Sequence, residues 1–241
     1  MSDNLVIDIS KWNGKVNFEK VKAAGVYGVM LRAGTGAGTI DPRFIENITA
    51  CNRLGIPVGV YWFSYATTPT EAELEAAFCV STIKPYKISL PVAYDWEEDS
   101  YKNAKKKGVT VDSITAISMA SRFLHVVQTA GYTPILYTNL DFQSRFFPKT
   151  ELIGYDRWIA AYRKIKPSGD FTMWQFTDKG TIDGINGNVD MSHLYKDYIA
   201  PAKPNYRNIV RERFDFEEKT MNYLAGYEYA DALFERLATK P

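Results

Sequence analysis

Four acidic side chains stand at the ends of segments that otherwise read as buried strands. Asp95 and Glu97 close the apolar run that starts at Leu90, in the order Asp-Trp-Glu. Asp8 closes the first such run of the chain, and Asp190 closes the last. Acids are depleted from strands because an unpaired buried charge is costly. Their presence at these positions therefore indicates that these carboxyl groups have a functional role.

The spacing of Asp95 and Glu97 suits acid–base catalysis. Side chains alternate along a strand, so carboxyl groups at i and i+2 share a face and lie about 6.5–7 Å apart. Two carboxylates at that separation disfavour joint ionisation, and one pKa rises. Glycoside hydrolysis needs such a pair, because one group protonates the leaving oxygen while the other handles the positive charge at the anomeric carbon. Alternation turns Trp96 away to pack beneath outer helices, and Glu98 and Asp99 are interpreted as solvated loop charges.

The elements that must position these acids follow the order strand, helix, strand, helix, which predicts a parallel sheet with helices outside. Expected strands cover 5–10, 26–34, 57–65, 90–97 and 133–139, and expected helices cover 18–25, 41–55, 68–83 and 113–131. The helix at 41–55 is expected to be capped by its first residue, Asp41. Three further strands, at 156–162, 171–177 and 185–194, leave no room for full helices between them.

Eight strands of this kind close a barrel that has no edges. We therefore predict an α/β fold, a TIM-like barrel with about five helical crossovers whose last strands lack full helices. An open doubly wound sheet is the alternative, but no G-x-G-x-x-G fingerprint follows the first strand. In such a barrel functional groups gather where strands end, so the four acids are expected to converge at one rim.

Composition excludes several classes of function. The net charge of +1 gives no reason to expect nucleic-acid binding or a polybasic membrane anchor. The first residues lack the pattern of a signal peptide, and no apolar run approaches the ~20 residues of a membrane span.

Cys51 and Cys79 are expected to be buried free thiols. His125 and His193 lie far apart and no C-x-x-C or H-E-x-x-H pattern occurs, so we expect no metal and no cofactor.

Aromatic residues make up 14% of the chain, and stacking on sugar rings is one use for them. All five tryptophans lie in or just after an expected strand: Trp12, Trp62, Trp96, Trp158 and Trp174. Those near the rim are candidates for sugar contact, and the others are expected to form core.

Together these motifs resemble glycoside hydrolase family 25, in the right order from residue 5 to about 195. The matching stretches are 8–10, 41–47, 59–63, 95–97, 136–138, 158–162, 174–177 and 187–190. The resemblance implies a lysozyme, or muramidase, that cleaves the β-1,4 bond between N-acetylmuramic acid and N-acetylglucosamine in bacterial peptidoglycan. It implies action at the bacterial cell wall, by an extracellular or phage-released protein.

The resemblance also assigns roles to residues. Glu97 matches the general acid/base and Asp95 the second catalytic carboxylate, which either assists the substrate's own acetamide or acts directly on the anomeric centre. Asp8 and Asp190 match the remaining acids, which position the sugar or tune the pair. Six residues are candidate substrate contacts: Arg32, Tyr61, Phe63, Tyr137, Trp158 and Gln175. Arg32 is expected to pair either with an acid or with a substrate carboxylate.

Two other functions are open. A chitinase-like hydrolase of other acetamido-sugar polymers would carry an acid two positions before Asp95, where this sequence has Ala93. A non-catalytic cell-wall-binding protein on the same fold would be expected to have lost one of the four acids, and all four are present.

The character of the sequence changes past residue 200. P-A-K-P at 201–204 reads as a linker, so we expect a catalytic barrel domain at 1–200 and a helical extension at 201–241. Apolar residues of the extension recur at helical intervals, and Gly226 is expected to divide them into two short helices. Such a stripe packs on the parent domain, forms a homodimer contact or binds the cell wall.

Overall fold

The computed structural model describes residues 4–199, 206–227 and 229–239. Contacts divide the chain into two compact units, residues 1–198 and 199–241, which are described separately. The linker at 201–204 and the boundary at residue 200 that the sequence predicts lie outside the described residues.

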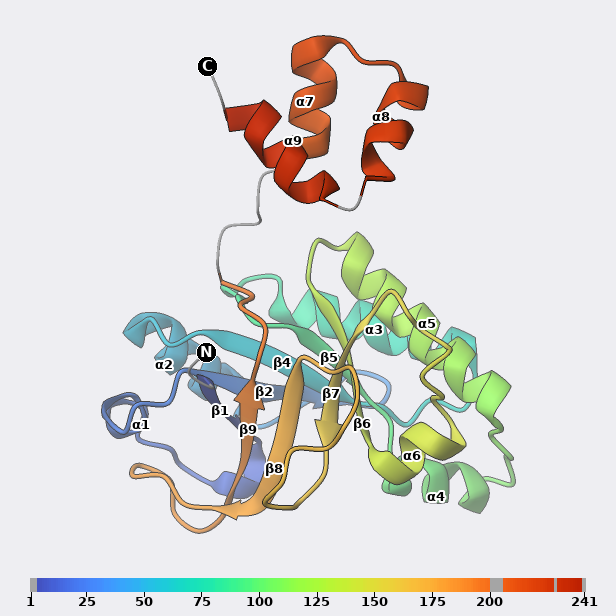
Figure 1. The fold of residues 1–241 in the computed structure, drawn as a ribbon. Helices are drawn as coiled ribbons and strands as arrows, with labels where there is room; N and C mark the ends of the chain where they lie inside the picture. Colours follow the sequence, from blue (N-terminus) through green and yellow to red (C-terminus); the bar gives the residue numbers. More distant parts are fainter. Residues whose placement is uncertain (1–3, 200–205, 228, 240–241) are drawn as a thin grey trace. The chain divides into compact units, whose positions relative to one another are not determined.

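The first unit is a closed barrel of eight strands with helices outside it, which confirms the predicted α/β fold (Figure 1). Around the ring the order is β1 (Asn4–Ile9), β9 (Val189–Leu194), β8 (Met173–Gly180), β7 (Asp156–Ala160), β6 (Pro134–Asn139), β5 (Val92–Asp95), β4 (Val58–Phe63) and β2 (Gly28–Thr35). Pairing of β1 with β2 closes the ring, and the short strand β3 (Thr39–Ile40) adds to β2 outside it.

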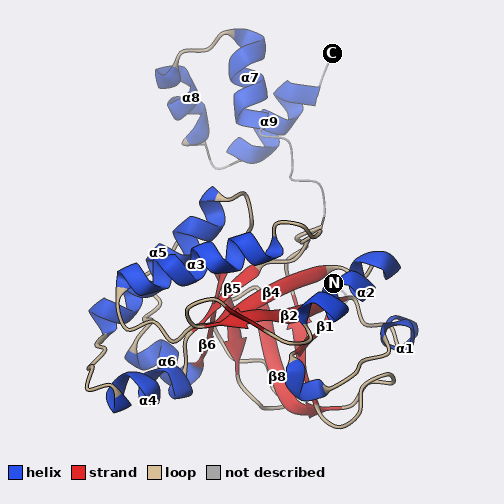
Figure 2. Ribbon diagram, turned by 180° about the vertical axis from the view of Figure 1, so that it is seen from behind, coloured by secondary structure: helices blue, strands red, loops and turns tan. Residues whose placement is uncertain are grey.

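Helices connect the parallel strands and cover one side of the barrel, as Figure 2 shows from behind. They are α1 (Phe18–Ala23), α2 (Phe44–Leu54), α3 (Pro69–Ile83), α4 (Glu98–Lys106), α5 (Ser113–Thr129) and α6 (Leu140–Arg145), with a 3-10 turn at Lys11–Asn13. Local signals explain their starts: Thr68 and Asp112 accept hydrogen bonds from the third residue of α3 and α5. No helix of the described residues separates β7, β8 and β9.

The strand β9 runs opposite to the other seven strands of the ring. It pairs antiparallel with β8 and β1, whereas the remaining pairings in the ring are parallel. The prediction that this strand ends at Asp190 was wrong, because β9 begins at Val189 and Asp190 stands at its start. Reversal carries that start to the rim where β1 ends, and Asp190 is the register partner of Asp8.

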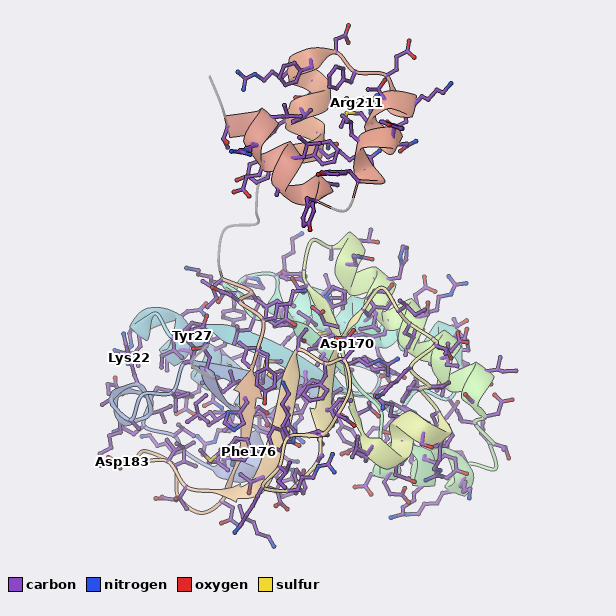
Figure 3. The ribbon with its side chains drawn as sticks, in the orientation of Figure 1. Lys22, Tyr27, Asp170, Phe176, Asp183 and Arg211 are labelled. Atoms are coloured by element: carbon purple, nitrogen blue, oxygen red, sulfur yellow. The ribbon has the colours of Figure 1, made fainter. Side chains whose placement is uncertain are left out.

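The core between sheet and helices is rich in aromatic rings. Trp96 is fully buried, as predicted from strand alternation, and its Nε1 donates to the carbonyl of Ala66 at 3.1 Å. Both cysteines are buried free thiols, also as predicted. Charged side chains such as Lys22 and Asp183 lie outside this core (Figure 3). Four rings pack against Trp96: Tyr101, Phe142, Phe146 and Phe147.

The second unit contains three helices among its described residues, α7 (Tyr206–Phe214), α8 (Glu218–Ala225) and α9 (Ala230–Thr239). The sequence predicted two helices, which correspond to α8 and α9 on either side of Gly226. It missed α7 because Val210 is the only buried residue of that helix, so no apolar stripe marks it. Val210, Met221 and Phe234 form a small core of their own. None of the helices in the described ranges of either unit is long and apolar enough to cross a membrane.

Candidate active site

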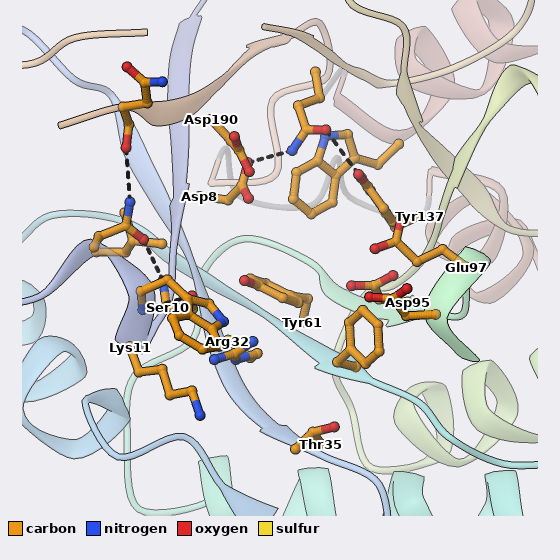
Figure 4. Close-up of a pocket in the computed structure, with 18 of the residues that line it drawn as sticks. Asp8, Ser10, Lys11, Arg32, Thr35, Tyr61, Asp95, Glu97, Tyr137 and Asp190 are labelled. Atoms are coloured by element: carbon orange, nitrogen blue, oxygen red, sulfur yellow. Dashed lines mark hydrogen bonds between the residues drawn. The ribbon is translucent and has the colours of Figure 1, made fainter. Parts of the chain in front are cut away.

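A cavity of about 570 Å³ opens at the barrel rim to which β1, β4 and β5 run (Figure 4). Its walls combine acids, aromatic rings and a guanidinium group. All ten residues singled out in the sequence line it: Asp8, Arg32, Tyr61, Phe63, Asp95, Glu97, Tyr137, Trp158, Gln175 and Asp190. The fold therefore brings together side chains from all eight strands of the ring and from the start of α4.

Asp8 and Asp190 form one carboxyl pair within this cavity. They are partners in the register of β1 and β9, and a hydrogen bond joins their side chains. Burial, followed by the negative charge of Asp190, raises the pKa of Asp8 well above its usual range. Burial also raises the pKa of Asp190. The pair therefore favours sharing a proton over joint ionisation.

Gln175 fixes that pair to the neighbouring wall of the barrel. Its Nε2 donates to Asp8 Oδ2 at 2.9 Å, and its Oε1 accepts from the hydroxyls of Tyr137 at 2.9 Å and Tyr162 at 3.1 Å. Trp158 supports this network from beneath, because it is only 1% exposed and its ring centroid lies 4.7 Å from that of Tyr137. Gln175 and Trp158 therefore hold the site's shape, and Trp158 offers almost no surface to a ligand.

Glu97 does not lie on a strand, contrary to the sequence analysis. The strand β5 ends at Asp95, and Glu97 is the N-cap residue of α4, where its backbone N–H donates to Ser100 Oγ at 3.2 Å. Burial raises the pKa of Glu97 to about 7, and the charge of Asp99 contributes next. The carboxyl group is therefore largely protonated up to near-neutral pH, as a general acid requires.

Asp95 is the most deeply set carboxyl on that side of the cavity. Burial raises its pKa well above the usual range, the charge of Glu97 adds to this, and Arg32 opposes it. Its Oδ1 is buried and accepts no hydrogen bond from any described residue. Because such an orphaned acceptor costs free energy, it is a natural partner for a donor on a bound ligand.

Asp99 was expected to be a solvated charge in a loop, but it belongs to a helix. It lies in the first turn of α4, lines the cavity, and is the charged group that raises the pKa of Glu97 most. Glu98 also lies in that turn, and its carboxylate pairs with Lys102 at 3.4 Å. The sequence missed α4 because its only buried side chains are Ser100 and Ala104, too small to make an apolar stripe.

Arg32 pairs with an acid, one of its two expected uses. Its Nε and Nη2 lie 2.7 and 2.6 Å from Asp41 Oδ2. Asp41 also accepts from the backbone N–H groups of Lys11 at 3.1 Å and Arg43 at 2.9 Å. Asp41 is therefore not the helix cap that was expected, since α2 begins at Phe44; it ties β2 to the loop after β1.

Several cavity residues were not identified as site residues from the sequence. Trp12 is the most notable, because its side chain lines the cavity yet is 79% exposed. A large exposed ring beside a polar cavity is a typical ligand platform. Its position directly after the first strand was the available signal. Among the described residues no group of three or more His, Cys, Asp or Glu side chains is arranged to hold a metal ion.

Known proteins resemble this chain in sequence and in fold. The model of the family "Glycosyl hydrolases family 25" matches residues 7–185. The uncharacterised protein YegX of Escherichia coli K12 is 28% identical over 199 residues, which cover 77% of this chain and 67% of YegX. The autolytic lysozyme of Clostridium acetobutylicum is 27% identical over 190 residues, 78% of this chain and 55% of that protein.

A solved structure of the modular autolysin LytC of Streptococcus pneumoniae, bound to a synthetic peptidoglycan ligand, superposes with a TM-score of 0.72. The two sequences are 30% identical, over 80% of this chain and 47% of LytC. The present chain thus spans about half the length of the autolysin and of the clostridial lysozyme that it matches.

Proposed function

The chain belongs to glycosyl hydrolase family 25, and from this premise we propose that it is a lysozyme of the bacterial cell wall. Its substrate is peptidoglycan, and the bond it hydrolyses is the β-1,4 bond from N-acetylmuramic acid to N-acetylglucosamine. The observation that carries the proposal is the meeting of Glu97, whose pKa is about 7, with Asp95, Asp8 and Asp190 in one cavity. Two carboxyl groups with separate roles are what glycoside hydrolysis requires.

Glu97 is the general acid of the first step. Its raised pKa keeps the carboxyl group protonated below about pH 7. As the bond from C1 to the leaving sugar breaks, Glu97 gives its proton to the departing oxygen, which leaves as a hydroxyl. Glu97 is then a carboxylate, ready to act as a base.

Asp95 orients the substrate's acetamide group. Its unpartnered Oδ1 accepts the acetamide N–H, which turns the carbonyl oxygen toward C1. That oxygen bonds to C1 as the leaving group departs and forms a cyclic oxazolinium ion, whose positive charge the Asp95 carboxylate stabilises. In the second step Glu97 takes a proton from water, the water oxygen bonds to C1, and the ring opens to restore the acetamide.

Asp8 and Asp190 act as a polar wall opposite Asp95 and Glu97. Figure 4 shows the two pairs on different sides of the cavity. Since Gln175 already occupies Asp8 Oδ2, Asp190 is the freer carboxyl group for contact with sugar hydroxyls. Burial also raises the pKa of the Tyr61 phenol well above its usual range, so it stays a hydrogen-bond donor.

The test is clearing of a suspension of purified cell walls by a Glu97→Gln variant. Loss of the acid is expected to lower the clearing rate by at least about a thousandfold. The matched control is Glu73→Gln, an exposed position on α3. Clearing by folded Glu97→Gln at the rate of the control would remove Glu97 from this role.

A further inference from the structure

A second groove continues outward from the active-site cavity and carries the opposite charge. One wall is the turn between β2 and β3, and the other is α4, which presents Lys102, Lys106 and, just past its end, Lys107. Thr35, Tyr65 and Asp99 line both hollows, so the groove and the cavity are continuous. We propose that this groove, termed the lysine groove, binds the carboxylates of the peptide stem that branches from N-acetylmuramic acid.

The ammonium groups of the groove make few ion pairs with the described residues. Lys106 and Lys107 form no ion pair with a described residue, and Lys102 is only loosely paired with Glu98 at 3.4 Å. Lys102 and Lys106 are four positions apart and share a face of α4, an arrangement that is unfavourable for two like charges. All three side chains are exposed, so they remain available to an anion.

The substrate class rests on the proposed function and supplies a fitting anion. The glycan backbone is uncharged, but the lactyl group of N-acetylmuramic acid carries a peptide whose side-chain and terminal carboxylates are negative. The active-site cavity is lined by acids and repels such groups. A stem that leaves the cavity past Thr35 enters the groove that the lysines line, where charge-assisted contacts with its carboxylates can form.

Thr35 supplies a second observation at the junction. Its Oγ1 is buried and has no hydrogen-bond partner among the described residues, although it lines both the cavity and the groove. An unpartnered hydroxyl can donate a hydrogen bond to a peptide carbonyl where the stem passes from the cavity into the lysine groove. The lysine groove thus begins with an unpartnered hydroxyl and continues with exposed ammonium groups.

The experiment compares two preparations of the same peptidoglycan strands. In one the stem carboxylates are free, and in the other they are converted to primary amides, which keeps the bulk of the stem and removes its charge. The triple variant Lys102→Gln/Lys106→Gln/Lys107→Gln is compared with Lys105→Gln, whose ammonium group lies 4.6 Å over the Tyr101 ring and does not line the groove. KM and kcat for release of reducing ends are measured on both preparations.

The triple variant is expected to raise KM on free-carboxylate strands about three- to tenfold, with kcat unchanged, and to match Lys105→Gln on amidated strands. Equal effects on both preparations, or none on either, would overturn the proposal. Failure of the wild-type protein to release reducing ends from any preparation would instead refute the lysozyme function.

Discussion

Asp8 and Asp190 face each other across the antiparallel pair of β1 and β9, so the first and last strands of the barrel each supply one carboxyl group to a single hydrogen-bonded pair. In a barrel of uniformly parallel strands the start of the last strand lies at the opposite rim. Reversal of β9 is therefore what brings Asp190 to the site. The pairing of β1 with β9 therefore both joins two strands of the barrel and brings Asp8 and Asp190 together.

The raised pKa of Glu97 predicts how activity depends on pH. Because the general acid must be protonated, kcat/KM for release of reducing ends is expected to fall as pH rises above about 7, by about tenfold per pH unit. Rates measured from pH 5 to pH 9, with circular dichroism to verify the fold at each pH, check this. A rate that stays constant up to pH 9 would contradict the assignment of Glu97 as the acid.

The same pKa predicts a gain in stability when Glu97 becomes Gln. The folded-state pKa of about 7 exceeds the reference value of 4.5, so the wild-type free energy of unfolding falls as pH rises between these values and then levels off. Glutamine cannot ionise, so the variant is expected to be more stable than the wild type by about 1–3 kcal/mol at pH 8, and equally stable near pH 4. Urea unfolding at both pH values tests this, and a variant less stable than the wild type at pH 8 would contradict it.

Arg32 is expected to be essential for stability because its partner, Asp41, is buried. Arg32→Ala leaves that carboxylate without its cation, at a cost of about 3–5 kcal/mol in the free energy of unfolding. The matched control is Arg53→Ala, which removes an exposed pair with Glu19 of the same 2.6 Å length and should cost less than about 1 kcal/mol. An equal loss of unfolding free energy in the two variants would show that burial does not determine how much an ion pair stabilises the fold.

Trp12 is expected to contribute to binding and not to folding. Its side chain is 79% exposed beside the cavity, so Trp12→Ala should leave the melting temperature unchanged while raising KM for peptidoglycan about tenfold. Trp12→Phe retains a ring and should recover most of the affinity. Steady-state kinetics on both variants make the comparison, and an unchanged KM in Trp12→Ala would remove Trp12 from the binding surface.

The barrel was predictable because its signals are local. The expected helix at 68–83 is α3 from Pro69 to Ile83, and its cap, Thr68, is readable three residues ahead of Glu71. The acids of the cavity were predictable for a related reason, since carboxyl groups at strand ends conflict with burial unless the rim uses them.

The features that the sequence did not predict are of two kinds. Some depend on contacts between residues from different parts of the sequence, and the others are helices without an apolar face. The direction of β9 is set by pairing with β1, at the other end of the barrel domain, and no residue of β9 encodes it locally. The pairing of Arg32 with Asp41 replaces an expected cap for the same reason. The helices α4 and α7 bury only small or single side chains, so the 3.6-residue period that reveals a helix is missing. A homodimer through the C-terminal helices stays a prediction.

The identity of the reducing-end sugar tests the proposed lysozyme activity most directly. Purified peptidoglycan is digested with the full chain, the products are reduced with borohydride, and the new ends are identified by mass spectrometry. Cleavage after N-acetylmuramic acid predicts that every new end is N-acetylmuramitol, and that Glu97→Gln produces none. New ends that are N-acetylglucosaminitol, or no new ends from the folded wild-type protein, would contradict the proposed function.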